Sequence, residues 1–113
     1  MKRPDPALLL DMLLAARRAE RFAQGILRED LDRDEMRQDA LVRALTVLGE
    51  AAGRVSEETR TEHSEIPWPQ IVGMRNRLVH EYFRIDLDVV WNVVSTELGP
   101  LINALQAIVP PEV

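Results

Sequence analysis

Apolar residues recur every three to four positions along most of the chain, the spacing that places them on one face of an α-helix. The first such segment covers residues 6–26, where Asp5 suits the N-cap and Pro6 the first helical position. Its stripe consists of Leu8, Met12, Ala15, Ala19, Phe22 and Ile26. Outside the stripe lie Leu9, Leu10, Leu13 and Leu14. Because the start of this helix is apolar nearly all round, we expect its excess surface to meet a second copy or a partner protein.

A charged connector, "REDLDRDEMRQD", leads into a second helical segment at residues 34–55. Its predicted buried face consists of Met36, Ala40, Ala44, Val47, Leu48, Ala51 and Val55. The stretch "GEAAG" at 49–53 carries small side chains that allow another helix to approach closely. Glu50 and Arg54 lie on the edge of the same face, four residues apart.

Two more helical segments follow a break at "SEETRTEHSEIPWPQ". The third covers residues 69–82, and the fourth begins after a cap at Asp86 or Asp88 and ends near Ile108. Gly99 and Pro100 fall inside the last pattern, which predicts a kink within one helix. Four such segments with mostly short connections predict an all-α, antiparallel bundle of four to five helices in a single domain over residues 1–113.

Composition narrows the function classes. The chain has no cysteine, which excludes disulfides and thiolate metal sites, and its net charge of -5 argues against broad affinity for nucleic acid. The opening "MKRPDPALLLDMLLAA" starts like a signal peptide, but Pro4, Asp5, Pro6 and Asp11 interrupt it and it is too short to span a bilayer. We therefore expect a soluble, cytoplasmic domain.

The candidate chemistry lies in "GMRNRLVHEYF" at 73–83. With Arg75 at zero on a helical wheel, Tyr82 lies at about −20°, Leu78 at about −60° and Val79 at about 40°. Arg75 is thus predicted in the middle of the apolar arc, where a guanidinium is costly unless it is paired or borders a cleft. Asn76 and His80, four residues apart, share one flank of that arc.

On spacing alone, structural roles explain the same residues better than catalytic roles do. His80 near a helix C-terminus interacts favourably with the helix dipole, and Arg75 is placed to form an ion pair with Glu50. An R-x4-H spacing also arises often by chance. No metal-binding set accompanies it, since His63 lies far from His80 and no acidic cluster is near, which agrees with metal-free chemistry.

Longer stretches carry a resemblance to a known family. "GEAAGRVSEETR", "IPWPQIVGMRNRLVHEYF" and "VVWNVV" occur in this order and together resemble the HepT-like branch of the HEPN superfamily of small all-helical proteins. The resemblance runs over most of the chain. Its most specific element, R-x4-H-x-Y, is matched by Arg75, His80 and Tyr82, and the family's polar residue after the arginine is matched by Asn76.

The resemblance implies the toxin of a type VII toxin–antitoxin system. Proteins of this family are homodimeric, metal-independent ribonucleases encoded beside a minimal nucleotidyltransferase antitoxin of the MNT type. By this resemblance Arg75 and His80 are catalytic, Asn76 supports them, and Tyr82 receives AMP from the antitoxin. The antitoxin uses the ATP, so no cofactor is expected on this chain.

The chemistry suits these side chains. RNA carries its own nucleophile, the 2′-hydroxyl, so cleavage requires a proton transfer and stabilisation of developing negative charge. His80 suits the first task and Arg75 the second. A two-fold dimer would bring two copies of His80 into one groove, and AMP on Tyr82 would add negative charge beside Arg75 and repel RNA.

Two other readings stay open at this point. The acidic charge and the apolar start of the first helix also fit a catalytically weak module that mainly associates with its nucleotidyltransferase. A lone histidine on a helical bundle also fits a phosphotransfer protein, although His80 lies near a helix end and no lysine follows it.

Overall fold

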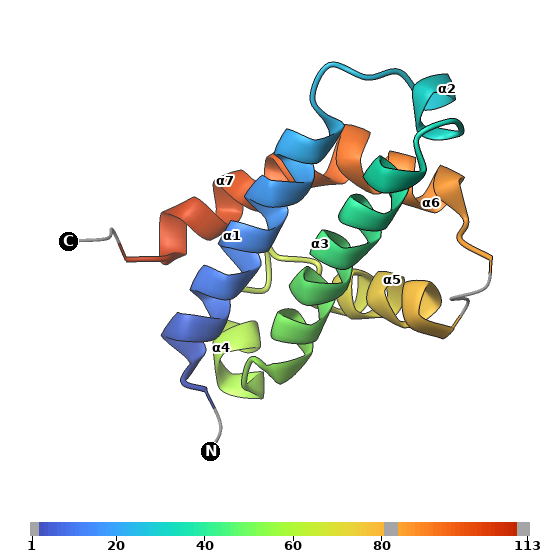
Figure 1. Cartoon of the computed structure of the whole chain (residues 1–113). Helices are drawn as coiled ribbons and strands as arrows, with labels where there is room; N and C mark the ends of the chain where they lie inside the picture. The colour runs from blue at the N-terminus through green and yellow to red at the C-terminus, as the bar shows by residue number, and fades with distance from the viewer. Residues whose placement is uncertain (1–2, 81–83, 111–113) are drawn as a thin grey trace.

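The computed structural model describes residues 3–80 and 84–110, and for His80 only the backbone. Within these residues the chain forms helices and no strand, which confirms the predicted all-α class (Figure 1). The elements are α1 (Asp5–Ala23), α2 (Arg28–Leu31), α3 (Glu35–Arg54), α4 (Glu57–Glu62), α5 (Trp68–His80), α6 (Leu87–Asn92), the π-helix η1 (Val93–Glu97) and α7 (Leu98–Ile108). None of the helices in the described part is both long and apolar enough to cross a bilayer.

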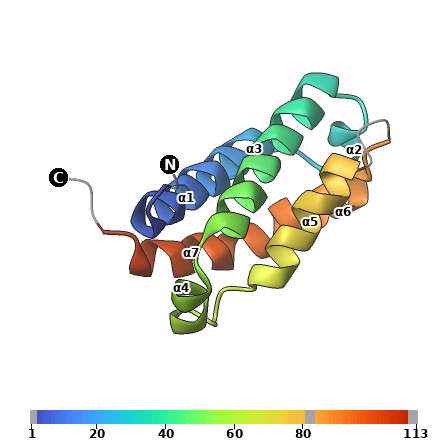
Figure 2. The same cartoon turned by 90° about the horizontal axis from the view of Figure 1, so that it is seen from below.

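Helices α1 and α3 run antiparallel side by side, and the other helices pack around this pair (Figures 1 and 2). Helix α5 crosses α3, whereas α7 lies against α1. The two short helices, α2 and α4, fall in segments that the sequence predicted as connectors. One turn of helix contains too few residues to display a hydrophobic period, which explains why the pattern missed them.

The ends of α1 differ from the prediction. The helix begins at Asp5 itself, with Pro4 as the N-cap residue. Instead of capping α1, the Asp5 carboxylate accepts hydrogen bonds from the Ser56 backbone N–H at 3.1 Å and from the hydroxyls of Ser56 and Thr59. The helix ends at Ala23 rather than near position 26, because Gly25 adopts a left-handed backbone with φ of 77°.

The apolar excess at the start of α1 is smaller than the sequence suggested. Leu9 and Leu13 are only 6% and 5% exposed, because α1 packs against α7 as well as α3 and so buries two of its faces. Leu14 remains 44% exposed, and Leu10 is half-buried. The apolar surface left for another molecule on this helix is therefore a narrow edge.

The predicted face of α3 is mostly correct. Ala44, Leu48, Ala51 and Val55 are buried as expected. The prediction for Met36 is wrong, since its side chain is 85% exposed in the first turn of the helix. Leu31 of α2 is instead fully buried at this end, where the Gln38 side chain donates to its carbonyl at 2.8 Å.

The last helical segment continues without a break from α6 through η1 to α7, as the sequence predicted. The irregularity is a π-helical turn at Val93–Glu97, separated from the Gly99–Pro100 pair by Leu98. Proline has no N–H, and its ring crowds the carbonyl four residues earlier, here that of Thr96. A widened turn at this point relieves that conflict while the helix goes on.

Candidate functional site

The site is built where α5 crosses α3. Gly49 of α3 is buried directly beneath Arg75, and a Cβ added at position 49 would overlap the Cβ of Arg75. One turn later, a Cβ added at Gly53 would lie 3.9 Å from Val72 Cγ2, an ordinary contact. The close approach predicted from "GEAAG" is therefore confirmed, and its closest point is the backbone that carries the candidate catalytic arginine.

Two neighbours hold the Arg75 guanidinium. Its Nη2 donates to Glu50 Oε1 at 3.1 Å, and its Nη1 donates to Asn76 Oδ1 at 3.0 Å. Its Nε is buried and has no hydrogen-bond partner among the described residues. The ion pair that the sequence offered as a structural role for Arg75 is present. Because the arginine side chain is still 30% exposed, the pair holds it without sealing it from solvent.

Arg75 lies at the edge of the apolar arc rather than in its middle. On one side of it, Ile71 and Leu78 are buried in the core. On the other side, Val72 is half-buried and Val79 is 39% exposed. The core covers one flank of the arc fully and the other only in part, since Val72 packs against the core while Val79 is exposed. The guanidinium therefore stands beside a partly covered apolar strip.

A shallow depression of about 200 Å³ opens at this point. Its lining residues are Gly49, Glu50, Gly53, Arg54, Val72 and Arg75. The glycines keep its floor low, and the two arginines bring guanidinium groups to it. Planar guanidinium forks bind phosphate oxygens in pairs, so the depression has the size and charge to receive one phosphate if Glu50 releases Arg75. The sequence placed Arg54 beside Glu50 but did not identify it as part of the site.

The predicted site continues along α5 with Asn76 and His80. Asn76 is exposed one turn before the end of α5, and its amide oxygen orients Arg75. His80 is the last residue of α5, so its backbone follows that of Asn76 by one turn on the same flank, as predicted. The side chain of His80 and the whole of Tyr82 lie outside the described residues.

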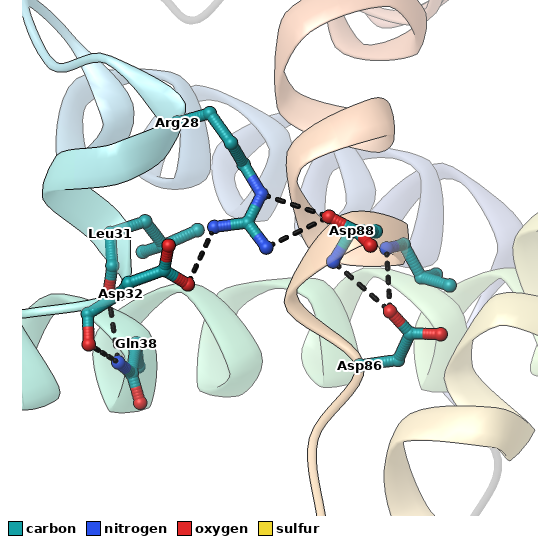
Figure 3. A network of polar contacts seen from close by, with 7 residues as sticks. Arg28, Leu31, Asp32, Gln38, Asp86 and Asp88 are labelled. Atoms are coloured by element: carbon teal, nitrogen blue, oxygen red, sulfur yellow. Dashed lines mark hydrogen bonds and ion pairs between the residues drawn. The ribbon is translucent and has the colours of Figure 1, made fainter.

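The segment after the motif is anchored at the start of α6 (Figure 3). The Asp86 carboxylate caps this helix by accepting from the backbone N–H groups of Asp88 at 3.0 Å and Val89 at 3.3 Å. Its other oxygen lies 3.8 Å from Nη2 of Arg77, an exposed residue of α5. One carboxylate thus links the end of the motif helix to the start of the next helix.

A second anchor comes from α2. Arg28 donates to Asp88 Oδ1 from Nε at 3.0 Å and from Nη2 at 2.8 Å, and its Nη1 donates to Asp32 at 2.8 Å (Figure 3). The hydrogen bonds to Asp32 and then Asp88 raise the pKa of Arg28 above its ordinary value. Arg28 and Asp88 are 60 positions apart, which is why the sequence pattern did not reveal this connection.

Within the described residues, no three histidine, cysteine or acidic side chains converge closely enough to hold a metal ion. Among the described residues, the charged side chains at the depression are those of Glu50, Arg54 and Arg75, and Asn76 is hydrogen-bonded to Arg75. Metal independence stays an expectation for experiment to test.

Comparison with known proteins finds similarity to a ribonuclease family model and to proteins named as putative or probable ribonucleases. The family model "Ribonuclease HepT-like" matches residues 12–108. A putative RNase, TTE0752, of Caldanaerobacter subterraneus subsp. tengcongensis is 36% identical over 79% of this chain and 80% of its own length. A probable ribonuclease HepT of Thermococcus cleftensis is 36% identical over 89% and 92%, and a putative RNase, MJ1380, of Methanocaldococcus jannaschii is 33% identical over 86% and 89%. No solved structure gives a significant match.

Proposed function

Because the chain belongs to the HepT-like ribonuclease family, we propose that it is a metal-independent endoribonuclease and the toxin of a type VII toxin–antitoxin pair. The observation that carries this proposal is Arg75, which is half-exposed at a depression of phosphate size and is oriented by Glu50 and Asn76. A buried structural ion pair would place the guanidinium in the core, whereas this pair leaves the arginine side chain 30% exposed.

In the proposed reaction, the RNA 2′-hydroxyl attacks the adjacent phosphorus and the bond from phosphorus to the 5′-oxygen breaks. One His80 imidazole accepts the proton of the hydroxyl, and another donates a proton to the leaving 5′-oxygen. Arg75 binds the non-bridging oxygens and stabilises their charge in the transition state. Asn76 keeps the guanidinium fork aimed at the phosphate. The products carry a 2′,3′-cyclic phosphate and a 5′-hydroxyl.

A homodimer supplies the second imidazole. The exposed Val79 and the half-buried Val72, next to the low floor at Gly53, form an apolar strip beside the site. A two-fold axis through this strip apposes the same surface of two copies and brings both motifs to one groove. We expect one RNA strand to lie along that groove.

Control of the toxin falls to Tyr82 and a nucleotidyltransferase antitoxin of the MNT type. The antitoxin transfers AMP from ATP to the tyrosine oxygen and releases pyrophosphate, so this chain itself needs no cofactor. The added phosphodiester competes with RNA for the guanidinium groups of Arg75 and Arg54, and the added bulk blocks the groove. In the bacterial or archaeal cell both partners act in the cytoplasm.

The test is cleavage of total RNA by the purified protein in the presence of EDTA. Wild type is expected to cut, and His80→Ala to lose activity. His63→Ala is the matched control, because His63 contacts only Glu65 among the described charged groups, at 3.6 Å. Equal RNA patterns for wild type and His80→Ala would refute the nuclease. The switch is tested by intact mass after incubation with antitoxin and ATP, where Tyr82→Phe is expected to abolish the AMP increment.

Two observations favour a second candidate, a catalytically weak module that mainly associates with its nucleotidyltransferase. Glu50 occupies part of the Arg75 fork, and the chain is acidic overall, both of which disfavour RNA. Growth arrest on expression that disappears in a folded Arg75→Ala variant would exclude this alternative.

A further inference from the structure

A second hollow lies on the flank of α5 that faces away from Asn76. It has a volume of about 390 Å³ and separates α5 from the η1–α7 segment, and we name it the α5–α7 groove. Figure 2 shows these two helical segments on the same side of the molecule. Its floor is apolar, with Leu48 and Leu98 each 1% exposed. Hollows of this size and lining are typical of binding sites.

The residues that line each wall of the groove recur every three to four positions, the spacing of one helical face. Pro67, Gln70, Ile71 and Met74 line one wall, and Val93, Glu97, Pro100, Leu101 and Ala104 line the other. At a rise of 1.5 Å per residue, these walls are about 10 Å and about 16 Å long. Two parallel rows of that length accommodate two to three turns of a third helix, the geometry by which amphipathic helices dock into grooves.

The π-helical turn forms part of the second wall. Val93, Thr96 and Glu97 of η1 all line the groove. A π-turn makes poorer backbone geometry than an α-turn, and such turns are frequent at functional sites. The Thr96 hydroxyl satisfies the carbonyl of Asn92 at 2.6 Å, so the widened turn is stable within the helix.

Charge at the rim indicates the chemistry of the occupant. Among the described residues, Glu65 and Glu97 are the only charged ones that line the groove, and both are exposed. Glu97 has no ion-pair partner in the described part of the chain, and Glu65 has only His63, at 3.6 Å. Two carboxylates beside an apolar floor favour an apolar stripe flanked by lysine or arginine.

A second copy of this chain does not supply such a stripe. The exposed large apolar side chains among the described residues are Leu14, Leu27, Met36 and Val79, which lie on four separate segments. None of these segments offers a second exposed apolar anchor at helical spacing.

We propose that the α5–α7 groove docks an amphipathic helical segment of a partner protein whose apolar stripe is flanked by basic residues. This binding site is separate from the candidate nuclease site and does not rest on the proposed function. Because the groove and Asn76 lie on opposite flanks of α5, the helix and RNA can be bound together.

The test uses the full chain and two synthetic helical peptides with the same leucine stripe, one flanked by lysines and one by glutamates. Fluorescence anisotropy is expected to show at least tenfold tighter binding of the lysine peptide, with affinity falling as salt rises. Glu97→Lys is expected to reduce this preference. Equal binding of both peptides by wild type would overturn the proposal.

Two arginine substitutions on α7 locate the binding. Ala104 is half-buried in the groove wall, and Ala107 is exposed outside the groove, so Ala104→Arg is expected to weaken binding at least tenfold and Ala107→Arg to leave it unchanged. Circular dichroism checks that both variants fold. If both substitutions change the peptide affinity equally, the peptide binds elsewhere. If Ala104→Arg changes the sedimentation coefficient of the protein without peptide, the groove is a contact between copies of this chain. Either result overturns the proposal. The Ala104→Arg variant is expected to cleave RNA as wild type does. Peptide binding and RNA cleavage can therefore be refuted independently of each other.

Discussion

Gly49 and Arg75 meet with no room for a side chain between them: a Cβ on the glycine would take the space of the arginine's own Cβ. Gly49 is held in the interior of α3, and the overlapping atom belongs to the stem of Arg75 next to the α5 backbone. The position of the candidate catalytic guanidinium is therefore set by a missing side chain on another helix.

Gly49→Ala is expected to destabilise the fold by about 1–3 kcal/mol, because α5 must shift to admit the methyl group. Gly53→Ala is the matched control on the same helix, since its Cβ would make only an ordinary contact at 3.9 Å from Val72. That change is expected to be neutral or stabilising by about 0.5–1 kcal/mol through helix propensity. Urea unfolding followed by circular dichroism measures both, and equal stabilities would contradict the close contact.

Glu50→Gln is expected to increase affinity for RNA, because it removes the carboxylate that competes with phosphate for Arg75. The cost in stability is expected to stay below about 1 kcal/mol, since this ion pair is partly exposed. The measurement is anisotropy with an RNA that carries a 2′-deoxy sugar at the cleaved position. Glu57→Gln removes the same charge from α4 and serves as the control. An equal gain of RNA affinity in both variants would show that the gain comes from the change in net charge alone.

Arg75→Ala is expected to lower the cleavage rate by about 10²- to 10³-fold, the usual cost of losing one group that stabilises transition-state charge. Arg75→Lys is expected to recover little, because an ammonium cannot bind two phosphate oxygens and donate to Glu50 and Asn76 as a planar fork does. Arg43→Ala, at an exposed position of α3, is the control. Single-turnover kinetics on a defined RNA measures the rates. Full activity in Arg75→Lys would show that Arg75 contributes only its positive charge and not the geometry of its guanidinium.

Arg28→Gln is expected to loosen the start of α6, because the guanidinium ties Asp88 to Asp32 across two segments. Hydrogen exchange of the amides at 87–90 is expected to rise, while those of α1 keep their protection. Raised salt is expected to reproduce part of the effect in wild type, since the pairs are exposed. Unchanged exchange in the variant would show that the Asp86 cap alone holds this helix.

The pH dependence of this connection follows from the pKa of Arg28. Its hydrogen bonds raise the folded-state pKa above the ordinary value, so its contribution is fully present below that value and is lost only as pH rises through the folded pKa. Between pH 5 and pH 9, about the range used for activity assays, Arg28 therefore contributes no pH dependence. Any change of α6 protection in that range must come from other groups.

Most of the fold followed from local pattern. The spacing of apolar residues located the four long helical segments, and most of the predicted stripe on α1 and face on α3 are buried. The errors lie where a contact distant in sequence replaces a local preference. Asp5 is the first residue of α1 rather than its N-cap, and its carboxylate accepts hydrogen bonds from Ser56 and Thr59 instead. Met36 is exposed because Leu31 of α2 fills that end of the core.

The candidate site divides in the same way. The sequence alone determined that Arg75, Asn76 and the backbone of His80 stand at fixed intervals on one helix, because residue spacing sets direction around a helix. Only the tertiary structure decided which flank of Arg75 opens to solvent, that Gly49 lies beneath it, and that Arg28 reaches Asp88. These depend on how helices cross, and crossing is chosen by the packing of side chains far apart in sequence, which the pattern of a single segment does not contain.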